Sequence, residues 1–566
     1  MPGCGVTEDG NIKDQTCSIF ANKIYMIRLT PIFCLLFVWC SCVQKQRVDA
    51  LYYNGHIQTV DSGLNVTEAF VVNDGKIVEL GTQKELQNKF KADTLVNLNK
   101  QYVYPGLIDA HCHFYGLGLF MQRVDLTGTR DFKEAVSLCM KFYARQQKNY
   151  LLGRGWDQNK WPGKAFPTNE ELNNAFPDVP VLLKRVDGHA AIANDYALNL
   201  AHLNTQTKVD GGELIQHNGK LTGLLIDNAV DLVENIMPKP SLKEKIKALM
   251  EAQAQCFDYG LTSVQDAGLD PDLIELIDSL QTLGIIKIRV NAMVSLTPAN
   301  LEYYLKKGII IKDRLQVNSF KMYGDGSLGS RGACLLKPYH DLPEHSGFLL
   351  TSIPDMELYI NKLANSRFQL NTHAIGDSTN RVLLELIAKA GSKMKDRRWR
   401  IEHAQVVDPI DRVRFGDLGV VPSVQPTHAT SDMYWAEERL GAQRLQNAYA
   451  YKSLLNQLGW LPLGTDFPVE AVSPFYTFDA AVSRKDANGF PLIGFQIKEA
   501  LTREEALQGM TIWAAMAAFE DGKKGSLSTG KFADFIVLDV NLLKDDLHKI
   551  RNTKPMAVYL GGVQVK

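Results

Sequence analysis

The stretch that most constrains this chain is residues 105–114, where two histidines stand two positions apart after an apolar, β-prone run. Side chains two apart on a strand point to the same face, so His111 and His113 are predicted to project together. Two neutral imidazoles at the end of a strand can share one metal ion. The alternative for such a pair is two structural or surface histidines, so the rest of the chain must decide between them.

Length and composition set the outer bounds. The chain has 566 residues, too many for one ordinary domain, and its 45% apolar and 22% charged residues are normal for a globular protein. The formal net charge of −1 gives no broad basic surface that would attract nucleic acid. We therefore expect a small-molecule substrate and no nucleic-acid partner, and a homodimer stays open as the assembly.

The N-terminus has the order of an export signal. Residues 29–39 are apolar apart from Thr30 and Pro31, basic residues precede them, and small residues and then a polar run follow. The apolar run is short for a membrane span. We expect residues 1–42 to direct export, with Met26 as an alternative start, and the protein to be periplasmic or membrane-anchored in a bacterium.

Cys42, which precedes the polar run, resembles the anchor site of a bacterial lipoprotein, although Trp39 and Cys40 stand where Leu and a small residue are usual. A cleaved signal without lipid and an uncleaved anchor are the alternatives. Any contact with a membrane is expected only through this anchor. Five of the nine cysteines lie in the leader, and the chain has no Cys-x-x-Cys pattern, so export rests on the leader and not on disulfides.

Both ends of the remaining chain predict short strands. Residues 69–80 carry two apolar runs around Asn-Asp-Gly, a hairpin signal, and residues 557–565 repeat the pattern around Gly-Gly. The economical interpretation is one small β-sandwich domain built from both termini, residues 48–104 and 515–566.

Residues 105–514 alternate β-prone runs with helical patterns, which predicts a parallel sheet with helical crossovers. Seven or eight such units fit an α/β fold of the (β/α)8 TIM-like barrel type, whose active site lies where the strands end. Residues 120–235 fit this rhythm poorly and are interpreted as an insertion that covers the barrel mouth. The predicted strands include 261–264, 286–294, 317–322, 369–372, 399–401, 420–424 and 460–463.

Four further polar residues directly follow or end predicted strands: Lys321, His373, His403 and Asp466. In a barrel they would face one cavity together with the histidine pair. Imidazoles and carboxylates without thiolates suit a catalytic zinc, iron or manganese ion. Singly, a buried histidine, an ion-paired lysine or a turn-capping aspartate would explain each residue, but their recurrence at strand ends favours a metal site.

Several motifs of the chain resemble those of a known family. Residues 105–114, 372–374, 402–404 and 464–466 are similar to the metal-site strands of the amidohydrolase superfamily. Residues 185–191, 321–331, 425–429 and 530–534 resemble the YtcJ-like (amidohydrolase 3) branch, which includes N-substituted formamide deformylases. The resemblance covers residues 48–566 and keeps the order of the motifs.

The resemblance implies one or two divalent metal ions, with zinc first and iron or manganese as alternatives. The implied ligands are His111, His113, Lys321, His373, His403 and Asp466. The first two would bind one ion with Asp466, which would also be the catalytic proton shuttle. The other two histidines would bind a second ion, and Lys321 would bridge both as a carbamate made with CO₂, a reaction that only a neutral amine undergoes. A single ion beside an unmodified Lys321 is the alternative.

Candidates for the substrate pocket are Trp156, Asp157, His189, Tyr323, Arg331 and His428. The expected reaction is hydrolysis of a non-peptide C–N bond, in an amide or an N-substituted formamide. The alternatives are a deaminase or cyclic-amide hydrolase on the same scaffold, and a non-catalytic surface-anchored binding protein, against which the intact ligand set argues. Residues 324–329 also match the dinucleotide fingerprint of an oxidoreductase, but no acidic residue in the expected βαβ setting supports it, so we expect no nicotinamide cofactor.

Overall fold

The computed structural model describes residues 45–146, 148–391 and 396–566. The predicted leader, residues 1–42, and its candidate anchor Cys42 lie outside the described residues. In the part of the chain that is described, no helix combines the length and the apolar character that a bilayer crossing requires.

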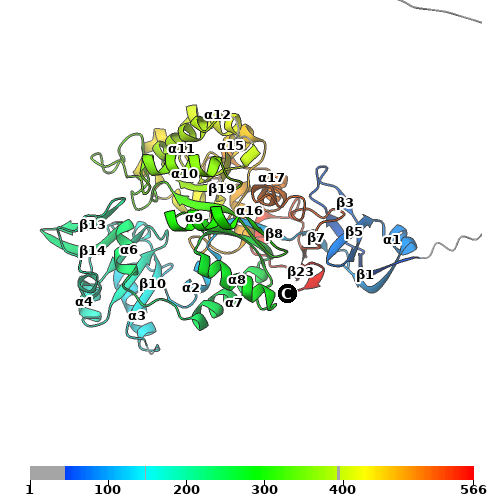
Figure 1. The fold of residues 1–566 in the computed structure, drawn as a ribbon, viewed down its shortest axis with the longest axis horizontal. Helices are drawn as coiled ribbons and strands as arrows, with labels where there is room; N and C mark the ends of the chain where they lie inside the picture. The colour runs from blue at the N-terminus through cyan, green and yellow to red at the C-terminus, as the bar shows by residue number, and fades with distance from the viewer. Residues whose placement is uncertain (1–44, 147, 392–395) are drawn as a thin grey trace, which may run out of the picture. The chain divides into compact units, whose positions relative to one another are not determined.

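Seven parallel strands form most of a barrel (Figure 1). Nearly all of their residues are buried, as expected for strands that are covered on both faces. In ring order the strands are β8 (Leu107–Cys112), β15 (Leu261–Leu269), β16 (Arg289–Ser295), β18 (Leu315–Tyr323), β19 (Gln369–Ala374), β20 (Arg400–His403) and β21 (Val421–Ser423). The short strand β17 (Ile310–Ile311) pairs with β18 in antiparallel fashion. The predicted α/β TIM-like class is confirmed.

The eighth position of the barrel is filled by a bridging segment and not by a full strand. Leu463 forms a parallel bridge with Val424 on one side and accepts a hydrogen bond of 3.2 Å from the N–H of Ala110 on the other. Pro462 has no N–H to give to a ladder, which keeps the pairing short. The predicted strand at 460–463 is therefore present as the link that closes the ring.

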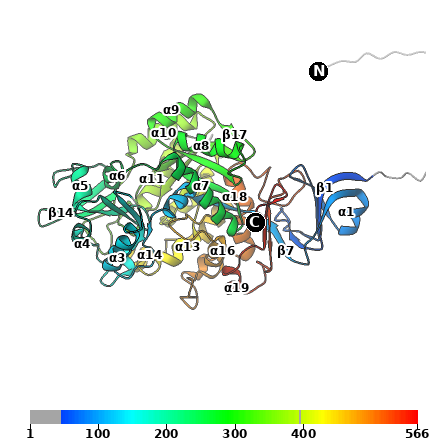
Figure 2. The same cartoon turned by 90° about the horizontal axis from the view of Figure 1, so that it is seen from below.

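Helices alternate with the barrel strands and follow the closing segment (Figures 1 and 2). In α7, Ser241 and Glu244 form a capping box that satisfies the first turn, and the buried residues recur at helical spacing. The helices are α2 (Phe114–Phe120), α7 (Leu242–Asp258), α8 (Pro271–Thr282), α9 (Pro298–Lys307), α10 (Ile353–Ala364), α11 (Asp377–Lys389), α12 (Pro409–Leu418), α13 (Pro426–Asp432), α14 (Ala436–Leu445), α15 (Tyr451–Leu458), α16 (Pro474–Ser483), α17 (Arg503–Gly509), α18 (Ile512–Ala517) and α19 (Leu547–Arg551).

Two further sheets share an apolar core to which both termini contribute, including Tyr52, Phe70 and Phe535. One sheet has the order β5 (Lys76–Gly81), β4 (Ala69–Asn73), β1 (Gln46–Tyr53), β6 (Phe90–Asn97), with α1 (Gln83–Lys89) between β5 and β6 in the chain. The other has the order β24 (Val563–Gln564), β23 (Ala557–Leu560), β22 (Phe535–Leu538), β7 (Tyr102–Pro105), β2 (His56–Gln58), β3 (Val66–Thr67). Strand β7 pairs with β22, so the sheet built from both termini is confirmed.

The segment predicted as an insertion contains a six-stranded mixed sheet of its own. Its order is β13 (Gly212–His217), β14 (Lys220–Asp227), β12 (Ala190–Ala193), β11 (Val181–Arg185), β10 (Leu151–Trp156), β9 (Val124–Asp125). Its helices are α3 (Phe132–Tyr143), α4 (Glu170–Ala175), α5 (Asp195–Leu200) and α6 (Asn228–Glu234). Separate apolar clusters form on the two faces of this sheet.

A buried ion pair joins the barrel to the terminal sheets. Arg289, the first residue of β16, donates from Nε and Nη2 to the carboxylate of Asp534 at 2.6 and 2.9 Å. Its guanidinium also lies 3.7 Å from the centre of the Phe532 ring. Such a pair leaves an uncompensated charge when one partner is removed.

Replacing Arg289 with Met should therefore lower the free energy of unfolding by about 3–5 kcal/mol, measured by guanidinium denaturation. The matched control is Lys312→Met, which removes an exposed pair with Asp278 and should leave the transition unchanged. Equal transitions for both variants would contradict a structural role for the Arg289–Asp534 pair.

Candidate metal centre

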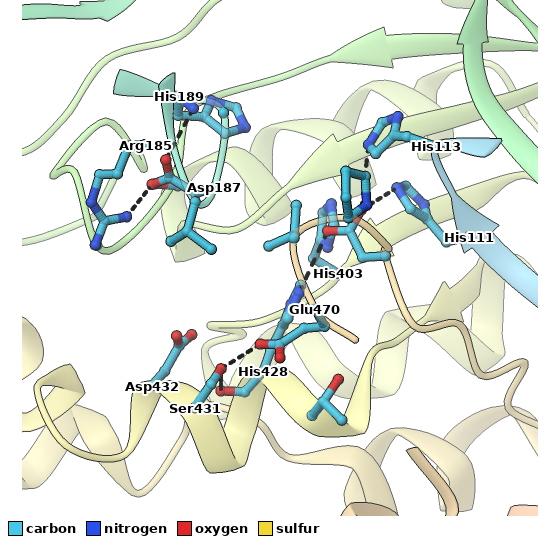
Figure 3. Close-up of a pocket in the computed structure, with 18 of the residues that line it drawn as sticks. His111, His113, Arg185, Asp187, His189, His403, His428, Ser431, Asp432 and Glu470 are labelled. Atoms are coloured by element: carbon cyan, nitrogen blue, oxygen red, sulfur yellow. Dashed lines mark hydrogen bonds and ion pairs between the residues drawn. The ribbon is translucent and has the colours of Figure 1, made fainter. Parts of the chain in front are cut away.

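Two histidines at the end of β8 form one side of the site (Figure 3). The Nδ1 atom of His111 lies 2.6 Å from the Glu402 carboxylate. The Nδ1 atom of His113 lies 3.1 Å from the carbonyl oxygen of Ala267. With Nδ1–H donating to these oxygens, each ring keeps Nε2 as a lone-pair donor toward a metal. Both Nε2 atoms face Oδ1 of Asp466, at 3.7 Å from His111 and 3.3 Å from His113.

Asp466 takes its position from a loop that Asp109 holds. Asp109 accepts hydrogen bonds from the N–H and the hydroxyl of Thr465, at 3.0 and 2.7 Å. The N–H of Asp466 donates to the His111 carbonyl at 2.8 Å, and a φ of 61° takes its backbone out of the strand conformation. Burial opposes the charge of Asp466, but the imidazoles of His113 and His111 hold the pKa of its carboxyl well below the ordinary value.

Three more imidazoles surround the same point. His403 ends β20 with a φ of 73°, and its Nδ1 lies 2.7 Å from Oε1 of Gln425. The Nε2 atom of His428, from α13, lies 3.5 Å from Oδ2 of Asp466. His373, on β19, places its ring centroid 4.6 Å from that of His403. Ligand atoms lie within 4.8 Å of one another in two triads: His111, His113 and Asp466, and His403, His428 and Asp466.

The donor set fits a divalent metal ion. Burial lowers the pKa of His111 to about 4, with the charge of Lys321 adding to the effect. Burial also lowers the pKa of His373 and His403 well below the ordinary value, so these rings are neutral ligands at pH 7. Oδ1 of Asp466 and Nε2 of His428 are buried without a hydrogen-bond partner among the described residues. Buried polar atoms that converge and lack a partner match a cation site.

Lys321 lies inside this cluster. Its Nζ is buried 3.4 Å from Nε2 of His111 and 5.1 Å from the centre of the Tyr323 ring. Burial lowers the pKa of its amine to about 8. The described residues place no carboxylate within 4 Å of Nζ, so this lysine is not the ion-paired residue of the alternative interpretation.

Glu402 is a functional residue that the sequence analysis did not single out. Its Oε1 lies 2.7 Å from Nε of Arg400, and its Oε2 holds His111. Burial opposes its charge, but Arg400 and His111 outweigh burial and lower the pKa of Glu402 to about 2. The available signal was an arginine and a glutamate two residues apart in a buried strand, where both share one face. Glu402 therefore orients the first metal ligand.

A cavity of about 1420 Å³ opens above the metal cluster. Of the predicted pocket residues, Asp157, His189, Tyr323 and His428 line it. Trp156 does not: it is fully buried in the insertion and donates from Nε1 to the Leu183 carbonyl at 2.8 Å. Arg331 does not either, because its guanidinium pairs with Asp341 at 2.8 Å beside the cavity.

The insertion and the segments that follow the barrel strands, helix α13 among them, supply cavity residues that sequence reasoning missed (Figure 3). Those from the insertion include Arg154, Arg185, Asp187 and Asp227. Those from the barrel include Ser431 and Asp432 of α13 and Glu470 of the loop after Asp466. Ser431 donates to Glu470 at 2.5 Å. Arg185 and Asp187 belong to a quoted motif, but nothing in the sequence showed that they meet the barrel.

The glycine-rich stretch at 324–329 is a loop that packs on the barrel. Asp325 within it accepts hydrogen bonds from the N–H groups of Ile375 and Gly376, at 3.0 and 2.8 Å. No helix of the described residues begins between β18 and α10. The strand–turn–helix setting of the dinucleotide fingerprint is therefore missing in this part of the chain.

Comparison with known proteins agrees with this geometry. The model of the amidohydrolase family matches residues 94–566. The protein LONG AFTER FAR-RED 3 of Arabidopsis thaliana is 33% identical and covers 91% of this chain and 91% of its own length. YtcJ of Bacillus subtilis (strain 168) is 30% identical, covering 86% of this chain and 94% of itself. The predicted YtcJ-like resemblance is confirmed.

Two more distant comparisons concern chemistry and fold. An N-substituted formamide deformylase of Arthrobacter pascens is 24% identical and covers 92% of this chain and 98% of its own. The crystal structure of an uncharacterized metal-dependent hydrolase from Pyrococcus horikoshii OT3 superposes with a TM-score of 0.73 at 28% identity. It covers 88% of this chain and 99% of that one.

Replacing Glu402 with Gln should weaken divalent-metal affinity by about 10- to 100-fold, because the neutral amide no longer fixes the His111 ring with a charged acceptor. Affinity is measured by competition with a chromogenic chelator, after circular dichroism has shown that the variant is folded. Glu499→Gln, which changes a carboxylate that binds Ser453 away from the site, is the control. Unchanged affinity in the Glu402 variant would contradict its positioning role.

Proposed function

This chain belongs to the amidohydrolase family, and we propose that it hydrolyses a non-peptide C–N bond, in an amide or an N-substituted formamide. The observation that carries the proposal is the meeting of His111, His113 and Asp466 at the mouth of a barrel, beneath a large cavity. The similarity to an N-substituted formamide deformylase supports the choice of bond.

The residues that would hold the metal are the two triads that share Asp466, with His373 and Lys321 beside them. A divalent ion bound there would supply Lewis-acid polarisation of the carbonyl and activation of a water molecule. We propose zinc as that ion, because imidazole and carboxylate ligands suit it. We further propose two ions per chain and a carbamate on Lys321, whose buried amine carries no paired carboxylate within the described residues.

Asp466 would carry out the proton transfers of the reaction. Oδ1 of Asp466 lies at the centre of the cluster without a hydrogen-bond donor, so it can accept a proton from the attacking water. From that position it can pass the proton to the leaving nitrogen, which must gain one as the C–N bond breaks.

His189 can steady the developing oxyanion. Its Nδ1 lies 2.6 Å from Asp227, and its ring centroid lies 5.0 Å from that of His373, at the cavity wall. Burial opposes its charge, but Asp227 more than offsets burial and raises the pKa of His189. The raised pKa favours the protonated ring, which can donate a hydrogen bond from its second N–H to an oxygen that becomes negative in the transition state.

Replacing Asp466 with Asn should lower kcat on N-substituted formamides by about 100- to 10,000-fold, because the amide cannot accept the proton. The rates are measured on metal-loaded protein, and the metal content of each sample is determined by elemental analysis. Asp408→Asn, at the start of α12, is the matched control. Full activity of the Asp466 variant would rule out the proposed proton shuttle.

The number of metal ions is tested by elemental analysis of protein purified without chelators. Two equivalents per chain are expected, together with loss of the second when Lys321 is replaced by Met. A single equivalent in the unmodified protein would support the mononuclear site with an ordinary amine on Lys321.

A further inference from the structure

We propose that Arg154 is an anion-binding subsite of the cavity, so that the substrate carries a carboxylate group besides the bond that is cleaved. The statement that the bound molecule is also cleaved rests on the proposed hydrolytic function. The anion-binding subsite itself rests on contacts of Arg154 that are independent of the reaction.

The sheet of the insertion aims Arg154 at the cavity. In the parallel ladder, Arg154 of β10 is in register with Asp125 of β9 and with Lys184 of β11. Register partners in a parallel sheet present their side chains on the same face. All three residues line the cavity. Regular secondary structure therefore fixes the face of the sheet on which the Arg154 side chain lies.

Arg154 differs from its charged neighbours in having few partners for its guanidinium. The only hydrogen bond of its guanidinium within the described residues runs from Nη2 to the Val186 carbonyl at 3.0 Å. Its Nε is buried without a partner, and none of the described carboxylates lies within 4 Å of its nitrogens. The side chain as a whole is half-buried in the wall of the cavity. Arg154 therefore offers unused donors to an incoming group.

The neighbouring cations in the cavity are already neutralised. Lys184 pairs with Glu234 at 2.6 Å. Arg185 pairs with Asp157 and with Asp187, the latter at 2.6 Å. Of the three cations that β10 and β11 place along the cavity, Arg154 is therefore the one left for a ligand within the described residues.

Two acids that line the cavity, Asp187 and Asp227, are engaged by other groups. Asp187 is engaged by Arg185 and by the hydroxyl of Ser327. Asp227 is engaged by His189. Burial lowers the pKa of Arg154, and the charge of Asp466 opposes this effect. Asp466 and Arg154 line the same cavity. One ligand can therefore reach the metal cluster and Arg154 together.

Space around the guanidinium is kept open by a glycine. A Cβ at Gly188 would lie 3.2 Å from Nη2 of Arg154, and its φ of +79° is one that other residues rarely adopt. A planar guanidinium binds carboxylate through two parallel N–H···O bonds, which selects this anion by shape as well as charge.

The experiment compares N-formyl and N-acetyl amino acids with their neutral primary amides as substrates of the zinc-loaded protein. We expect kcat/KM to favour the carboxylates. Arg154→Met should lower kcat/KM on the carboxylates by about 10- to 100-fold, mainly through KM, and leave the neutral amides unchanged. Lys160→Met removes an exposed charge from the rim of the same cavity and is the matched control. Arg154→Lys should recover part of the preference.

Equal turnover of charged and neutral substrates by the unmodified protein would overturn the subsite while leaving the hydrolase proposal intact. The same would follow if Arg154→Met lowered kcat equally on both series, as a purely structural residue would. If no compound is hydrolysed, the proposed function fails, and the subsite is judged by binding. Calorimetric titration with an N-acetyl amino acid and its amide must then show tighter binding of the acid, and Arg154→Met must abolish the difference.

Discussion

The hydrogen bond between His111 and Glu402 is the interaction on which the rest of the site depends. Glu402 is itself held by Arg400, which also donates to Gln265, to the Ala110 carbonyl and, at 2.9 Å, to Ser423. This buried network connects strands on both sides of the barrel. Buried charges are costly unless each is paired, so the network leaves the His111 ring one orientation, with Nε2 directed toward Asp466.

Two candidate ligands, His403 and Asp466, point into the cluster because their backbones adopt strained conformations. His403 and Asp466 both have positive φ values, 73° and 61°, in a region that costs a non-glycine residue about 1–3 kcal/mol. A strand that kept its alternation would place His403 opposite to Glu402, since they are adjacent residues. The left-handed turn lets both side chains serve the same site. The carboxylate of Asp109 stabilises the second turn through its bonds to Thr465.

The sequence predicted what depends on local periodicity. Strand ends placed Lys321, His373 and His403 correctly relative to the barrel strands, and the hairpin signals located the terminal sheets. Periodicity tells which face a residue is on, but it does not tell which distant residue it meets. The sequence therefore could not predict that Glu402 acts across the barrel on His111. It also could not predict that Arg154 lines the cavity. Trp156 shows the converse, because this candidate for the substrate pocket packs in the core of the insertion.

The barrel carries the metal ligands and the insertion carries charged cavity residues, because the two sheets are buried differently. Barrel strands are covered on both faces, so only their ends are free to carry chemistry, and the ligands gather there. The sheet of the insertion instead presents a row of charged side chains in register. Of the two cations in this row, Lys184 pairs with Glu234, whereas Arg154 has no counter-ion within the described residues. A new substrate can be accommodated by changing that row without disturbing the His111–Glu402 network. The insertion is therefore the part of the molecule in which selectivity can diverge while the reaction is kept.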